Sequence, residues 1–113
     1  MTDKLALGVR LRESDLPLVS RGGGASTTRL VNRSIGAKTI LNGITNIPPG
    51  GAIPLHYHNC EESVLVLSGD GIAVLGNDEV QVTSGDVTWI PPELPHQFKN
   101  SSDQDTLRIF WTY

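Results

Sequence analysis

The apolar residues of this chain stand in short runs, and no stretch of a dozen residues repeats them at helical spacing. The runs are rich in β-branched residues, and clusters of Gly, Pro, Asn and Asp separate them, which is typical of strands joined by turns. Many short strands at close spacing predict an all-β sandwich or barrel. We expect strands over residues 39–47, 63–67, 72–75, 79–82, 87–90, 96–99 and 106–113.

The first 38 residues show a weaker pattern. Residues 7–11 and 29–35 could form strands. Residues 20–28 (SRGGGASTT) predict a flexible loop, because no Gly-Lys-Ser/Thr follows the glycines to make a phosphate-binding turn. Further along, Gly76-Asn77-Asp78 predicts a tight hairpin turn, since Gly and Asn tolerate positive φ.

Length and composition predict one domain over residues 1–113 of an ordinary globular protein, with 38% hydrophobic residues and a net charge of −3. The chain has no basic cluster, so we expect no nucleic-acid partner. No apolar run approaches the roughly 20 residues of a membrane span, so we expect no membrane association. Arg10 and Arg12 interrupt any signal-peptide core, and the single Cys60 has no intrachain partner. These features predict a cytoplasmic protein.

Two of the three histidines stand close together in PLHYHNCEES. In a strand, His56 and His58 would project from the same face, because residues two apart share a face. Two imidazoles held in this way can bind one metal ion, and Glu62 follows closely enough to add a carboxylate. The alternative is a solvated loop with two incidental histidines, since short His/Glu clusters are weak signals on their own.

The third histidine, His96, follows a strand and a proline-rich turn in GDVTWIPPELPHQFKN. With this segment included, the chain resembles the small single-domain proteins of the cupin superfamily over residues 50–100. Glu93 stands where the family pattern has Gly, which leaves the geometry of that turn open. The matching residues are Gly50, His56, His58, Glu62 and Gly69 in the first motif and Gly85, Pro91, His96 and Asn100 in the second.

The resemblance implies a jelly-roll β-barrel with a metal site inside it. The implied ligands are His56, His58, Glu62 and His96. Glu61 is the rival carboxylate, but its spacing from His58 is shorter than the family pattern allows. Mixed nitrogen and oxygen ligands suit a divalent Fe, Mn, Ni, Co, Zn or Cu ion, so the sequence leaves the metal open. Four protein ligands leave two positions of an octahedral ion for a substrate or for O₂.

Other residues are candidates for substrate contacts. Phe98 shares the inward face with His96 and either walls the pocket or packs in the core. Phe110 is expected to help surround the site with apolar surface. Arg108, on the last strand, either binds a substrate carboxylate or faces solvent. Cys60 is either a soft metal ligand or a spectator in the ligand loop.

A second chain is the expected protein partner. Sheet edges in the weakly patterned N-terminal region and outward apolar residues such as Leu65 and Leu67 would be covered in a homodimer. Trp89 and Trp111 are expected in the core or in an interface.

These features predict a metal-dependent enzyme with a small-molecule substrate. The first hypothesis is a dioxygenase acting on an enol, diketone or aromatic compound, in which Glu62 also takes a substrate proton. One alternative is a non-redox isomerase, epimerase or lyase acting on a sugar or a small acid. The other is a module that binds a small ligand with the help of the metal. The fold alone does not decide among them.

Overall fold

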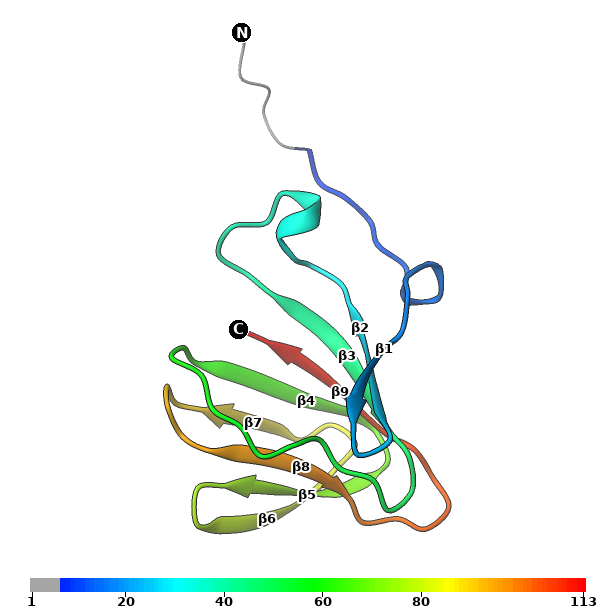
Figure 1. Ribbon diagram of the computed structural model, residues 1–113, viewed down its shortest axis with the longest axis vertical. Coiled ribbons are helices and arrows are strands. Elements are labelled where there is room, and N and C mark those ends of the chain that lie inside the picture. The colour runs from blue at the N-terminus through cyan, green and yellow to red at the C-terminus, as the bar shows by residue number, and fades with distance from the viewer. Residues whose placement is uncertain (1–6) are drawn as a thin grey trace, which may run out of the picture.

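A computed structural model describes residues 7–113, which form two antiparallel sheets facing each other in a jelly-roll barrel (Figure 1). The larger sheet has the strand order β1-β2-β3-β9-β4-β7, and the smaller sheet has the order β6-β5-β8. The strands are β1 (Val19–Gly22), β2 (Ala25–Arg29), β3 (Asn42–Ile47), β4 (Glu62–Ser68), β5 (Asp70–Leu75), β6 (Asp78–Thr83), β7 (Val87–Ile90), β8 (His96–Asn100) and β9 (Leu107–Thr112). Within this range the only helical elements are two 3₁₀ turns, η1 (Glu13–Asp15) and η2 (Arg33–Ile35).

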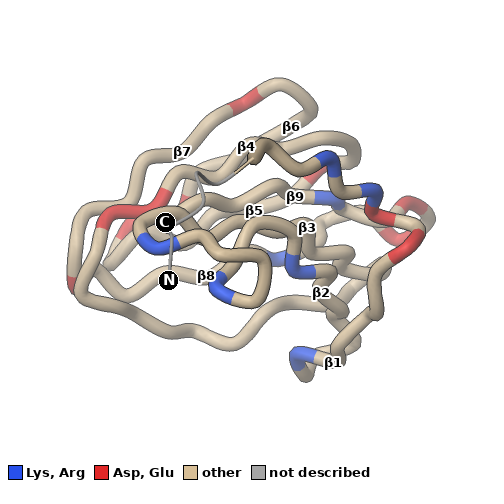
Figure 2. The backbone as a smooth tube through the Cα atoms, turned by 90° about the horizontal axis from the view of Figure 1, so that it is seen from above, with Lys and Arg blue, Asp and Glu red and all other residues tan. Residues whose placement is uncertain are grey.

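The seven strands expected from the sequence are present, with ends shifted by up to three residues. The hairpin turn after β5 is also confirmed, because Leu75 pairs with Asp78 across Gly76 and Asn77. Charged residues are distributed over both sheets and their loops (Figure 2). No helix in the described range is both long and apolar enough to cross a membrane.

The expectations for the N-terminal region were wrong. Residues 20–28 are not a loop but most of the β1–β2 hairpin, whose turn is made by glycines with positive φ. Thr27 of this hairpin can be buried because its hydroxyl shares a hydrogen bond of 2.8 Å with that of Thr45. Residues 7–11 form no strand. Residues 29–35 do not continue β2, because the Asn32 side chain accepts the Ser34 N–H at 2.8 Å and starts η2 instead.

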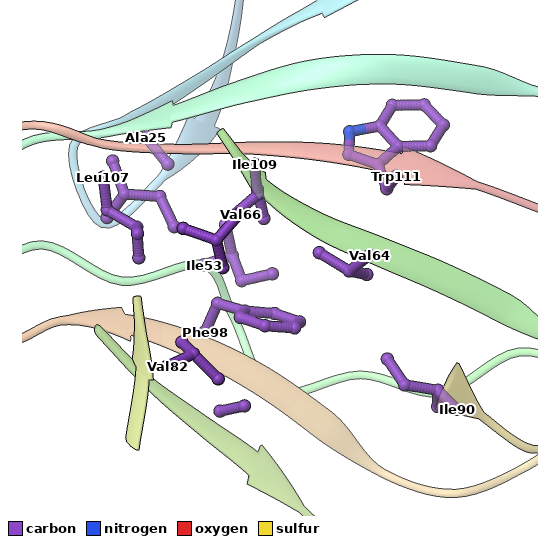
Figure 3. Packing of buried hydrophobic residues seen from close by; sticks show 12 residues of the cluster. Ala25, Ile53, Val64, Val66, Val82, Ile90, Phe98, Leu107, Ile109 and Trp111 are labelled. Carbon is purple, nitrogen blue, oxygen red and sulfur yellow. The ribbon is translucent and has the colours of Figure 1, made fainter. Parts of the chain in front are cut away.

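The core lies between the two sheets, where buried hydrophobic side chains of both sheets pack together (Figure 3). On β9, Leu107, Ile109 and Trp111 are buried, while the residues between them face the other way. Phe98 from β8 packs against this row and is 1% exposed. The alternation continues toward the end of the barrel where the histidines lie, so the strands that build the core also wall the site.

Candidate metal centre

Three separate backbone segments bring the histidines and Glu62 together. Glu62 begins β4 and His96 begins β8, while His56 lies in the extended segment between β3 and β4. The backbones of His56 and His96 pair with each other, with N–H···O distances of 3.1 and 2.8 Å. His58 follows two residues later. As a result, the ligand atoms of His56, His58, Glu62 and His96 all lie within 4.8 Å of one another.

The orientation of each imidazole is fixed by a backbone carbonyl. A carbonyl oxygen only accepts hydrogen bonds, so each Nδ1 must carry a proton, and each neutral ring presents a lone pair at Nε2. This second contact is the usual way in which a metal-binding histidine is held. The Nδ1 atoms of His56, His58 and His96 lie 2.9, 3.2 and 2.9 Å from the carbonyl oxygens of Pro54, Cys60 and Leu94, respectively.

The Nε2 atoms converge on the Glu62 carboxylate. Glu62 Oε1 lies 3.0 Å from His58 Nε2 and 2.9 Å from His96 Nε2. His96 Nε2 is buried, and its contact with Oε1 lies outside hydrogen-bond alignment, so this nitrogen has no hydrogen-bond partner among the described residues. Lone pairs facing a carboxylate oxygen repel it unless a cation stands between them. The three nitrogens and one oxygen therefore fit a divalent transition metal.

The pKa shift of His96 also indicates that a cation is favoured at this site. Burial lowers the pKa of His56, with a further contribution from the neighbouring His96. Burial also acts to lower the pKa of His96, but the adjacent Glu62 carboxylate and the Leu94 carbonyl outweigh it, and the pKa of His96 is raised. Glu62 therefore favours a positive charge at His96 Nε2, which either a proton or a metal ion can supply.

The turn that carries Glu93 keeps a geometry suited to glycine. Glu93 has φ of 69°, in the left-handed region, and it is the only residue other than Gly to have positive φ in the described range. Its backbone N–H donates to the His58 carbonyl at 2.7 Å. The turn before His96 is thus tied directly to the loop that carries the other two histidines.

The structure distinguishes between Glu61 and Glu62 as the carboxylate ligand. Glu61 turns outward, where its Oε1 accepts a hydrogen bond of 2.8 Å from Trp89 Nε1, and Glu62 alone joins the histidines. Cys60 lies 3.7 Å from His58 Nδ1, on the nitrogen that faces away from the cluster. Its thiol is therefore not among the converging ligand atoms.

A small cavity of about 20 Å³ adjoins the cluster. Phe98 lines it and is also part of the buried core, so both positions considered from the sequence apply. Sequence reasoning did not assign Trp111, Tyr113 or Arg21 to this cavity. Alternation along the last strand could have indicated the first two, because they share the inward face with Ile109. Arg21 lies in the segment that was expected to be a loop, so no signal pointed to it.

Tyr113 packs between a metal-ligand candidate and the aromatic wall of the cavity. Its ring stacks on the His58 imidazole with a centroid distance of 4.5 Å and on Trp111 at 5.3 Å. Burial raises the pKa of Tyr113, and the negative charge of Glu62 adds to the effect, while the positive charges of Arg21 and Arg29 oppose it. The phenol therefore stays protonated at neutral pH.

The structure corrects the expected positions of Arg108 and Phe110. Both lie on the face of β9 opposite Trp111, and neither lines the cavity beside the histidines. Arg108 instead reaches Glu13 Oε1 and Asn46 Oδ1, each at 2.8 Å. The reason is the alternation of β9, which sends its odd-numbered residues into the barrel.

Comparison with known proteins identifies the family. Residues 43–113, more than half of the chain, match the family model described as a cupin domain (Cupin_2). The chain belongs to the cupin family. Protein SchB of Streptomyces halstedii is 30% identical to this cupin over 97 residues, which cover 85% of the chain and 70% of SchB. Auxin-binding protein 4 of Zea mays is 32% identical over 83 residues, or 66% of the chain.

Among solved structures, the polyketide cyclase RemF from Streptomyces resistomycificus is similar, with a TM-score of 0.82 and 25% identity over 94% of this cupin and 78% of RemF. The match to the maize protein spans only 41% of that relative's length. The proteins that resemble this chain include one named for binding and one named for catalysis. The fold alone therefore does not assign a function, and the chemistry of the site has to be considered.

Proposed function

We propose that this cupin is a metal-dependent enzyme that acts on an enolisable dicarbonyl compound and closes a ring in it by forming a carbon–carbon bond. The observation that carries the proposal is the Glu62 carboxylate, which directs Oε1 at two imidazoles in a buried site. A divalent ion held by the four ligands would act as a Lewis acid on the substrate's carbonyl oxygens. The likeness to the cyclase RemF supports ring closure as the reaction.

Glu62 is the proposed base. Its Oε1 makes both contacts with the histidines, whereas Oε2 makes no hydrogen bond or ion pair within residues 7–113. Oε2 is therefore free to take a proton from the carbon next to the polarised dicarbonyl unit while Oε1 stays with the ligands. A carboxylate can act as general base on such a C–H group when a bound cation polarises the neighbouring carbonyl.

Tyr113 is the proposed acid, because its phenol stays protonated beside the ligands. The electron pair released from the C–H bond forms the new bond to a second carbonyl carbon of the same substrate. The oxygen of that carbonyl takes up two protons, the first from Tyr113, and leaves as water while the attacking carbon loses a second proton and forms a double bond to the attacked carbon. No oxidant or reductant is needed, and the proton that Glu62 removed returns to solvent or to the leaving oxygen.

Dioxygenase chemistry is the second candidate. It is favoured by the number of protein ligands, since four donors leave two positions on an octahedral ion for a substrate and O₂. Both candidates begin with the same chelated dicarbonyl unit, and they differ in whether oxygen is consumed.

The test uses diacetylacetone, a linear tricarbonyl compound that loses one water on closing to orcinol. Protein loaded with Zn(II), Mn(II) or Fe(II) is incubated with it under argon and in air, and the product is followed by mass spectrometry and an oxygen electrode. We expect orcinol under both atmospheres. Oxygen uptake without orcinol would favour the dioxygenase.

Single substitutions test the roles assigned to Glu62 and Tyr113. Glu62→Gln should abolish turnover per bound metal, and Tyr113→Phe should slow it by about 10²-fold or more, the usual contribution of one acid–base group. Glu61→Gln is the matched control, because its carboxylate faces Trp89 and not the ligands. Equal loss of activity in Glu61→Gln and Glu62→Gln would contradict the assigned base.

A further inference from the structure

The space around the site is divided between two cavities of very different size. The cavity beside the histidines holds about 20 Å³, roughly the space for one water molecule. A second cavity of about 370 Å³ lies next to it, and Trp111 and Tyr113 line both. A volume of this size is typical of sites for small organic ligands. Only the chelating end of a substrate therefore fits beside the metal ligands, and its remaining atoms must occupy the larger cavity.

The walls of these cavities carry three positive charges. Arg21 lines the small cavity, and Arg29 and Arg33 line the large one. In residues 7–113 none of the three makes an ion pair with a carboxylate, whereas Arg108 on the outer face is paired with Glu13. Arginines left unpaired around a ligand-sized cavity are suited to hold a carboxylate with two parallel hydrogen bonds.

Strand pairing explains how Arg29 reaches this place. Arg29 pairs with Gly43, and Gly43 pairs with Trp111, so the three lie in one row across β2, β3 and β9. A Cβ atom at Gly43 would stand 2.5 Å from the Trp111 indole. The missing side chain lets the indole pack closely against the β3 backbone at Gly43. Arg21 lines the small cavity, and the positive charges of both Arg21 and Arg29 act on the Tyr113 phenol.

We propose that Arg21 and Arg29 bind a carboxylate of the substrate, so that the natural substrate is an anionic dicarbonyl compound. The dicarbonyl part of this inference rests on the proposed function. The charges agree, because three neutral imidazoles, one carboxylate and a divalent ion leave one positive charge, to which the two guanidinium groups add. The carbon skeleton lies along Trp111 in the larger cavity, and the dicarbonyl end passes Tyr113 to the ligands.

The test compares three diketones that share one chelating unit. Acetylpyruvate carries a carboxylate where acetylacetone has a methyl group, and ethyl acetylpyruvate has the same skeleton without the charge. The chain has two tryptophans, so a Trp89→Phe background leaves Trp111 as the single reporter of binding by fluorescence quenching. In Zn(II)-loaded protein we expect acetylpyruvate to bind roughly tenfold to a hundredfold more tightly than its ester. Equal affinity of acid and ester would overturn the proposal.

Arginine variants test where the substrate carboxylate binds. Arg21→Gln with Arg29→Gln should remove the preference for the acid while the affinity for acetylacetone and the zinc content stay unchanged. Arg12→Gln is the control, since Arg12 is an exposed arginine outside both cavities. A preference that persists in the double variant would mean that the carboxylate binds the metal directly, and the proposal would be wrong. If the double variant does not fold, the two single variants decide by the same criterion.

The binding measurement and the turnover measurement test the anion site and the cyclase activity independently. An arginine-dependent preference for acetylpyruvate in protein that does not convert diacetylacetone would uphold the anion site and reject the cyclase. Conversion of diacetylacetone with no difference between acid and ester would uphold the cyclase and reject the anion site.

Discussion

Replacing Glu93 with Gly tests how much free energy the turn before His96 stores. Glu93 has φ of 69° and an exposed side chain, so its conformation and not its burial dominates the effect. The left-handed region costs a residue with a Cβ roughly 1–2 kcal/mol. Glycine removes that cost but loses about 0.5–1 kcal/mol more than other residues through the freedom of the unfolded chain. We expect Glu93→Gly to raise the free energy of unfolding by about 0.5–1 kcal/mol.

Thermal and urea denaturation measure this difference. For a domain of this size, it corresponds to a rise in melting temperature of roughly 2–8 °C. Glu93→Ala is the control, because Ala removes the carboxylate but keeps the Cβ atom and the strain. The backbone N–H that binds the His58 carbonyl is present in all three proteins. If the Ala variant proves as stable as the Gly variant, the gain comes from the lost charge and the argument from backbone strain is refuted.

Replacing His56 and His96 together with Ala should abolish stoichiometric metal binding in a protein that stays folded, and undiminished metal by elemental analysis would contradict the site. Asn100→Ala should lower the free energy of unfolding by about 2–4 kcal/mol, because the buried amide donates to two backbone carbonyls at 2.9 and 2.7 Å; urea denaturation measures it, and a loss well below 1 kcal/mol would count against it. We also expect a homodimer that covers the edge strand β7, where Trp89 is 62% exposed, and light scattering at the monomer mass of 12.2 kDa would exclude it.

The sequence predicted those parts of the fold that depend on short-range patterns. Strands β4 to β9 alternate or run apolar between clear turn residues, so their order and approximate ends could be predicted. The ligand set came from the resemblance to the cupin superfamily, and the structure brings the same four residues together. Tertiary pairing decided the rest. Ser20–Thr28 looked like a loop because it is rich in glycine and small polar residues, but part of it pairs with β3, and Thr27 is buried in a hydrogen bond with Thr45.

The positions of the functional arginines could not be predicted from the sequence either. From the sequence, Arg108 was the arginine proposed to bind a substrate carboxylate. In the structure, the alternation of β9 places its side chain on the outer face, where it binds Glu13. Arg21 and Arg29 line the cavities because the β1–β2 hairpin pairs with β3, a contact that neither spacing nor periodicity could show. Both also lie before residue 43, where the match to the cupin domain begins. The metal ligands come from the matched segment, and the proposed carboxylate site comes from the hairpin that precedes it. In this cupin, exchanging the hairpin should therefore alter which anion is bound while the metal remains in place.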